Sequence, residues 1–147
     1  MLYQISVADP ASRFVEISYT VSGIQSEFIE VQLPAWRPGR YEIQNFAKYI
    51  QRLEVQGQSG QPRPFRKITK DRWLIDTSGE QEVAIRYNFY ANIQNAGSSY
   101  VDEDLRSPNF INFCMYTEGR ITEPCRVELA LPPHYEIACG LPEVEKH

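Results

Sequence analysis

The amino-acid sequence predicts an all-β fold, an antiparallel β-sandwich or curved-sheet domain of about ten strands with one short helix. Apolar and polar residues alternate with period two along much of the chain, and turn-forming residues interrupt the alternation at short intervals. Hydrophobic residues make up 42% of the 147 residues and aromatic residues 12%, which is typical of a globular protein. We expect residues 1–147 to form a single domain, because the length suits one domain and no linker divides the chain.

The individual elements follow from local patterns. Alternation is clearest in residues 15–21, 29–33, 83–89 and 127–131, where β-branched and aromatic residues occupy every second position. Shorter patterns predict strands at residues 2–7, 49–55, 65–68, 72–77, 110–116 and 135–139. Residues 41–48 have apolar side chains at helical spacing and predict the short helix.

Charge and composition exclude several classes of partner. The formal net charge is −4, so the chain is a poor candidate for binding nucleic acid or an anionic membrane through its charge. No apolar run approaches the roughly 18 residues of a membrane-spanning helix. The N-terminus lacks the basic-then-apolar layout of a signal peptide, and three cysteines cannot all pair, which together favour reduced thiols and a cytoplasmic location.

The chain carries no catalytic motif. It has two histidines, one at the C-terminus and one, His134, beside Pro132 and Pro133. Neither HExxH nor CxxC occurs, so we expect no metal site within these residues. The cysteines fall on predicted strands, Cys114 and Cys139 within the ranges given above and Cys125 at the start of a strand over residues 125–131. All three are expected to be partly buried and unreactive.

The segment from Leu33 to Ile43 breaks the strand pattern. Pro38 and Gly39 suit the central positions of a type II turn, where proline fixes the first φ and glycine takes the positive second one. Trp36 and Tyr41 flank this turn. The sequence favours a rigid turn whose aromatics plug one end of the core over a loop that faces a ligand or another domain.

A second segment, residues 90–109, is long and polar, and strands are predicted on both sides. Asp102, Glu103 and Asp104 lie within it and could attract a cation such as the α-ammonium group of a peptide. Neighbouring residues of an extended chain point to opposite faces, which disfavours a compact metal site. A solvated hairpin extension is the favoured interpretation on these residues alone.

These residues resemble a known family. Residues 33–41, LPAWRPGRY, followed by Asn45-Phe46-Ala47, resemble the LPxWxPGxY…xFA signature of the glycyl aminopeptidase family. Further landmarks match in order: residues 7–10, 14–17, 70–73, 86–92, 116–120 and 131–133. The resemblance therefore covers nearly the whole chain. Members are zinc metallopeptidases with a thermolysin-like catalytic domain and usually a PDZ domain, and the signature lies in their N-terminal β-domain.

The resemblance implies a noncatalytic N-terminal domain that packs on the catalytic domain of the same polypeptide and helps to shape the pocket for the N-terminus of a peptide substrate. No cofactor is expected in this chain; the family's zinc would be held by a HExxH pair and a downstream glutamate outside it. Two sets of site residues follow from the resemblance. The interdomain or structural motif comprises Trp36, Arg37, Pro38, Gly39, Arg40 and Tyr41, and the candidates to face the substrate are Tyr90, Asn92, Tyr100, Asp102 and Asp104.

Two alternatives remain open on the residues themselves. A stand-alone sandwich that binds peptide or carbohydrate would expose several tyrosines or tryptophans together on one sheet, since aromatic rings stack on sugar rings. A purely structural domain that mediates association would instead present an apolar surface near Trp36.

Overall fold

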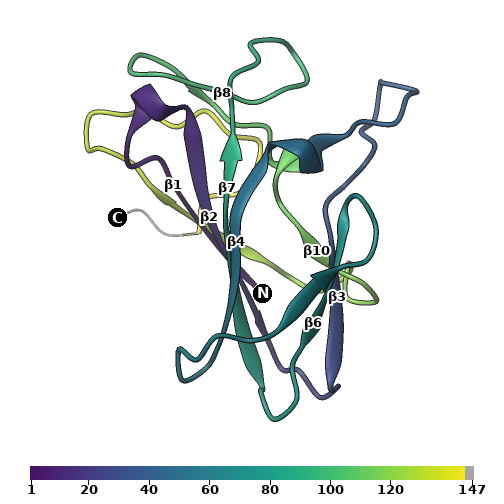
Figure 1. Cartoon of the computed structure of the whole chain (residues 1–147). Helices are drawn as coiled ribbons and strands as arrows, with labels where there is room; N and C mark the ends of the chain where they lie inside the picture. Colours follow the sequence, from purple (N-terminus) through teal and green to yellow (C-terminus); the bar gives the residue numbers. More distant parts are fainter. Residues whose placement is uncertain (145–147) are drawn as a thin grey trace.

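Residues 1–144 are described by a computed structural model; they form eleven strands in three sheets, with three 3₁₀ helices and no α-helix (Figure 1). The strands are β1 (Leu2–Ser6), β2 (Phe14–Ser22), β3 (Phe28–Gln32), β4 (Ile50–Gly57), β5 (Phe65–Lys67), β6 (Arg72–Asp76), β7 (Glu82–Tyr90), β8 (Tyr100–Val101), β9 (Arg106–Ser107), β10 (Tyr116–Thr117) and β11 (Arg126–Ala130). The 3₁₀ helices are η1 (Pro10–Ser12), η2 (Phe46–Tyr49) and η3 (Phe110–Asn112). The predicted all-β fold class is confirmed.

Two larger sheets face each other across the core (Figure 1). One has the order β11-β1-β2-β7-β4 and the other β10-β3-β6-β5, while β8 and β9 form a separate hairpin. All pairs are antiparallel except β1 with β11, which run parallel. The parallel pair joins the beginning of the chain to residues 126–130, so β11 rather than β1 is the edge strand of the larger sheet.

The alternating pattern of β2 places its apolar side chains in the core, as the sequence predicts. Val15, Ile17, Tyr19 and Val21 are buried, and the intervening residues are only partly buried. Every second residue of β7 is buried in the same way, and Trp73 of β6 lies in the core as expected. The buried residues of both sheets thus form one hydrophobic core.

Buried tyrosines tie the two sheets together. The rings of Tyr3 and Tyr19 stack with centroids 4.5 Å apart, and the Tyr19 hydroxyl lies 2.8 Å from Thr117 Oγ1 in β10. The Tyr87 hydroxyl donates to the carbonyl oxygen of Phe113. Burial raises the pKa of the Tyr3 and Tyr87 hydroxyls, so both stay protonated hydrogen-bond donors. The Tyr3 hydroxyl donates to the carbonyl oxygen of Met115, so each of the three hydroxyls has a hydrogen-bond partner inside the core.

Three predicted elements differ from the structure. The predicted helix at residues 41–48 is the 3₁₀ helix η2, because Gln44 N donates to Ala35 O (2.7 Å) and holds the preceding residues in an irregular path. The predicted strand at residues 110–116 is η3 followed by the two residues of β10. Residues 135–139 form no strand, since Tyr135 N bonds back to Pro132 O (3.0 Å) in a reverse turn and the segment pairs with no sheet.

In the described part of the chain, no helix has the length and apolar character needed to cross a membrane.

Candidate functional site

Two segments that the sequence analysis singled out meet at one end of the sandwich. The segment after β3, residues 33–45, and the segment after β7, residues 91–109, both emerge at the top of the view in Figure 1. They touch through Arg37 and Gly97: a Cβ added at Gly97 would lie 1.8 Å from Arg37 Nη2. Only a residue without a side chain leaves room for the guanidinium there. We call residues 33–45 the aromatic loop and residues 91–109 the acidic loop.

The turn of the aromatic loop is confirmed. Gly39 has φ +83°, in the left-handed region that favours glycine, and Arg40 N donates to Arg37 O at 3.3 Å. The Arg40 guanidinium donates to the Glu42 carboxylate, and this hydrogen bond lowers the pKa of Glu42. The buried side chain of Leu33 anchors the start of the loop.

The interpretation that the aromatics of this turn plug the core is wrong. Trp36 is 47% exposed, Tyr41 92% and Ile43 79%. The hydrogen bonds at Arg40 and Gln44 close the loop on itself away from the core, so its large side chains point into solvent. The tip of the aromatic loop is therefore an apolar surface on a hydrogen-bonded base.

The carboxylate of Asp102 in the acidic loop accepts hydrogen bonds from neighbouring residues of the same hairpin. Its Oδ1 accepts from the backbone N–H groups of Asp104 (3.0 Å) and Leu105 (2.7 Å) and closes the turn between β8 and β9. Its Oδ2 accepts from the Tyr100 hydroxyl at 2.8 Å and lies 3.9 Å from Arg13 Nη1. These contacts, the Tyr100 hydrogen bond foremost, lower the pKa of the carboxyl group.

The other acidic-loop candidates lie around this hairpin. Tyr90 is partly buried with its ring 5.2 Å from that of Phe14, while the exposed Asn92 forms a backbone bridge to Tyr100. Asp104 is exposed at the tip of the hairpin. The hairpin extension favoured by the residues alone is therefore present as β8 and β9.

Arg13 is a member of this cluster that sequence reasoning missed. Its guanidinium lies 4.8 Å over the Tyr100 ring and donates to Val101 O at 3.1 Å. Hydrogen bonding to Tyr100 raises the pKa of Arg13. The residue has φ +63° at the end of η1, which turns the chain toward the acidic loop. No local pattern predicts that Arg13 contacts the acidic loop, because Val101, whose carbonyl oxygen it binds, lies 88 positions further along the chain.

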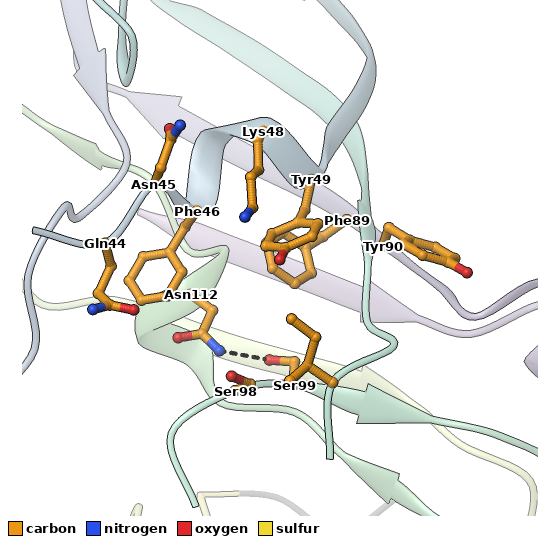
Figure 2. A pocket seen from close by; sticks show the side chains of 11 residues that line it. Gln44, Asn45, Phe46, Lys48, Tyr49, Phe89, Tyr90, Ser98, Ser99 and Asn112 are labelled. Atoms are coloured by element: carbon orange, nitrogen blue, oxygen red, sulfur yellow. Dashed lines mark hydrogen bonds between the residues drawn. The ribbon is translucent and has the colours of Figure 1, made fainter. Parts of the chain in front are cut away.

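A small pocket of about 80 Å³ opens between η2, the end of β7 and the acidic loop (Figure 2). Phe46 and Phe89 contribute apolar walls, and the Lys48 ammonium lies 4.8 Å over the Tyr49 ring. The buried amide of Asn112 lies 3.2 Å from Ser99 Oγ, so a polar contact joins the acidic loop to η3. The sequence analysis did not predict this pocket, whose lining comes from four separate segments.

The remaining chemistry-bearing residues lie apart from these loops. Among residues 1–144 no three His, Cys, Asp or Glu side chains come together in a way that would hold a metal ion. Burial raises the pKa of the Cys114 thiol to about 12, which keeps it protonated near neutral pH. The predicted placement of the three cysteines on strands is wrong, since Cys114, Cys125 and Cys139 all lie outside any strand. The predicted partial burial is also wrong for Cys125 and Cys139, which are exposed.

The basis of the carbohydrate-binding alternative is also removed. Tyr3, Tyr19 and Tyr87 are buried between the sheets, and Trp73 lies in the core. The exposed aromatics are Trp36 and Tyr41 in one loop and Phe28 and Phe65 on β3 and β5, so the described residues expose no group of tyrosines or tryptophans on a sheet.

The chain is a β-domain built on two larger sheets. Its exposed aromatic side chains Trp36 and Tyr41 and its acidic residues 102–104 lie on two loops at the same end of these sheets. Residues 2–147 match the family described as the Peptidase M61 N-terminal domain. This chain belongs to that family, the glycyl aminopeptidase family, as the resemblance in the sequence indicated.

A solved structure supports this assignment. The crystal structure of an aminopeptidase N family protein from Idiomarina loihiensis superposes with a TM-score of 0.81 at 30% sequence identity and covers 90% of this chain. The match covers 22% of that protein, so the domain there is part of a much longer chain. No curated protein matches the sequence.

Proposed function

We propose that this chain is the noncatalytic N-terminal domain of a zinc-dependent, glycyl aminopeptidase-like metallopeptidase. Membership of the M61 N-terminal domain family supports the assignment, as does the longer Idiomarina loihiensis protein in which the matching part is 22% of the chain. In this proposal the zinc and its ligands belong to another part of the polypeptide. The domain contributes surface and position, and no bond-making step.

The observation that carries the proposal is the exposed apolar tip of the aromatic loop. Trp36, Tyr41 and Ile43 are exposed to solvent on one loop. Large apolar side chains that lie exposed on one surface are typical of an interface with another protein or domain. The turn at Gly39 and the Arg37 contact with Gly97 hold this tip in place. We assign it as the surface that packs on the catalytic domain of the same polypeptide.

In this proposal the acidic loop beside it recognises the peptide substrate. An aminopeptidase binds a free α-ammonium group, and an unpaired carboxylate attracts it most directly. Asp102 is already hydrogen-bonded, so its part in this proposal is to fix the hairpin. Asp104 and Asn92 are exposed at the same loop and are the side chains we propose to approach the substrate, with Tyr90 and Tyr100 supporting them.

The test compares variants of the full-length protein on a peptide with N-terminal glycine. We expect Asp104→Asn to raise KM by roughly tenfold, because one charge-assisted contact to the ammonium group is lost. Glu103→Gln is the matched control, since Glu103 is the adjacent exposed carboxylate. Unchanged kinetics of Asp104→Asn would remove the substrate role, and absence of any zinc-dependent aminopeptidase activity in the full-length protein would remove the proposed function.

A further inference from the structure

Arg106 of β9 differs from the other arginines in the described part of the chain. Seven arginines have a carboxylate within 4.0 Å: Arg13, Arg40, Arg63, Arg72, Arg86, Arg120 and Arg126. Arg52 and Arg66 are exposed to water, and Arg37 is partly exposed with its guanidinium against Gly97. The Nε and Nη1 atoms of Arg106 are buried, and no residue among 1–144 accepts a hydrogen bond from them.

The hairpin geometry explains why this guanidinium is buried. Arg106 lies directly opposite Val101 in the β8–β9 pair, and residues opposite each other share one face of a hairpin. Val101 is fully buried, so Arg106 points to the inner side of the hairpin. Three N–H bonds on Nε and Nη1 are thereby removed from water.

The C-terminal segment covers this group. The Tyr135 ring centroid lies 4.4 Å from the Arg106 guanidinium carbon, and the Tyr135 hydroxyl donates to Glu103 O at 3.1 Å. A stacked ring attracts a cation but accepts none of its in-plane N–H bonds. The contact therefore shields Arg106 and leaves its donors unused, which is energetically unfavourable for a buried charge.

We propose that Arg106 is a binding site for a carboxylate group, which Tyr135 covers in this chain. A planar carboxylate matches the fork of N–H donors on a guanidinium. The carboxylates of Asp102, Glu103 and Asp104 belong to the same hairpin and repel a dianion such as phosphate more than a monoanion. The carboxylate is either that of a small molecule or that of an acidic side chain elsewhere in the longer polypeptide.

The first experiment uses the 147-residue chain, in which the buried residues of both sheets form one core. The Nε–H resonance of Arg106 is followed by NMR during titration with sodium acetate, with sodium chloride and inorganic phosphate at matched ionic strength. We expect acetate to shift this resonance saturably, and Tyr135→Ala to strengthen acetate binding about threefold because the competing ring is gone. The Nε–H of Arg86, an exposed arginine paired with Glu54, is the internal control.

Variants make the outcome decisive. Arg106→Met keeps the length of the side chain without its donors and should abolish the acetate response while raising Tm by about 2–4 °C. His134→Ala, beside Tyr135, should leave acetate binding unchanged. The proposal is overturned if acetate and chloride act alike on Arg106 in both the original chain and Tyr135→Ala, or if Arg106→Met lowers Tm.

The two sources of the carboxylate are separated in the longer polypeptide, and only this arm rests on the proposed function. If an acidic side chain of that polypeptide occupies the site, Arg106 Nε–H should show the acetate-bound shift without acetate and stop responding to it. If the ligand is a small molecule, acetate should still shift the resonance there. Lack of aminopeptidase activity would leave the result on the 147-residue chain intact.

Discussion

The aromatic loop and the acidic loop leave the same end of the sandwich but use their side chains in opposite ways. The aromatic loop is held by the turn at Gly39 and by the ion pair between Arg40 and Glu42. Its large side chains Trp36, Tyr41 and Ile43 remain in solvent. In the acidic loop the side chain of Asp102 is used within the loop, because it accepts three hydrogen bonds from its own hairpin. Residue type alone therefore misjudges which side chains are available to a partner.

This contrast has a physical basis. A buried core and two sheets already hold the base of each loop, so the aromatic side chains at the tip add little to the stability of this chain. A hairpin with strands of two residues has few backbone hydrogen bonds and needs side-chain support. Asp102, Tyr100 and Arg13 supply that support.

The largest expected effect separates the base of the aromatic loop from its tip. Leu33→Ala removes a fully buried side chain and should lower the free energy of unfolding of this chain by about 2–5 kcal/mol. Trp36→Ala should change it by less than about 0.5 kcal/mol, since the ring is half in solvent and its base is held elsewhere. Urea denaturation of both variants measures the difference. A large loss in Trp36→Ala would show that the tip is structural and would contradict its assignment as a docking surface.

A smaller effect is expected where the two loops touch. Gly97→Ala places a Cβ against the Arg37 guanidinium and should destabilise the chain by about 1 kcal/mol, at the low end for overpacking because that side chain is flexible. In an Arg37→Ala background the same change should have no effect, as the clashing atoms are gone. Denaturation of the single and double variants gives the coupling. Equal losses in both backgrounds would mean that the loops are not joined by this contact.

The sequence predicted the parts of the fold that are encoded locally. β2 and β7 are predictable because each alternates over nine residues. The turn at Gly39 is predictable because proline restricts φ and glycine accepts the positive φ that other residues avoid. The parallel pairing of β1 with β11 escaped prediction, since it joins residues 2–6 to residues 126–130 and leaves no local pattern. The two-residue strands β8, β9 and β10 are too short to show alternation.

The candidate site divides in the same way. The motif around Trp36 was visible in the sequence, but its exposure depends on the hydrogen bond from Gln44 to Ala35, which residue types do not reveal. The three acidic residues at 102–104 were equally visible. Which of them is free depends on the Tyr100 hydroxyl and on the path of the hairpin backbone. The roles of Arg13 and Arg37 require the distant segments to be placed in space.

The smallest expected effect concerns the charge of the acidic loop. The hydrogen bond from the Tyr100 hydroxyl is the main cause that lowers the pKa of Asp102, so Tyr100→Phe should raise that pKa toward the ordinary aspartate value of about 3.9. Because the carboxyl pKa is lower in the folded chain than in the unfolded one, the Asp102 contacts stabilise the hairpin above the unfolded pKa. That contribution is lost as the pH falls through the folded pKa.

The measurement is a carbon-13 NMR titration of the Asp102 carboxyl, with the Leu105 amide proton as the reporter of the hairpin turn. In the original chain both signals should change together at a pH below the ordinary aspartate pKa, and in Tyr100→Phe the shared midpoint should move upward. Tyr90→Phe is the matched control, because the Tyr90 ring packs on Phe14 and not on Asp102. If the midpoint of Asp102 stays the same in Tyr100→Phe, the carboxylate does not depend on that hydrogen bond. Only the two backbone hydrogen bonds to Oδ1 would then hold Asp102 in the hairpin, and Oδ2 would be available to a partner.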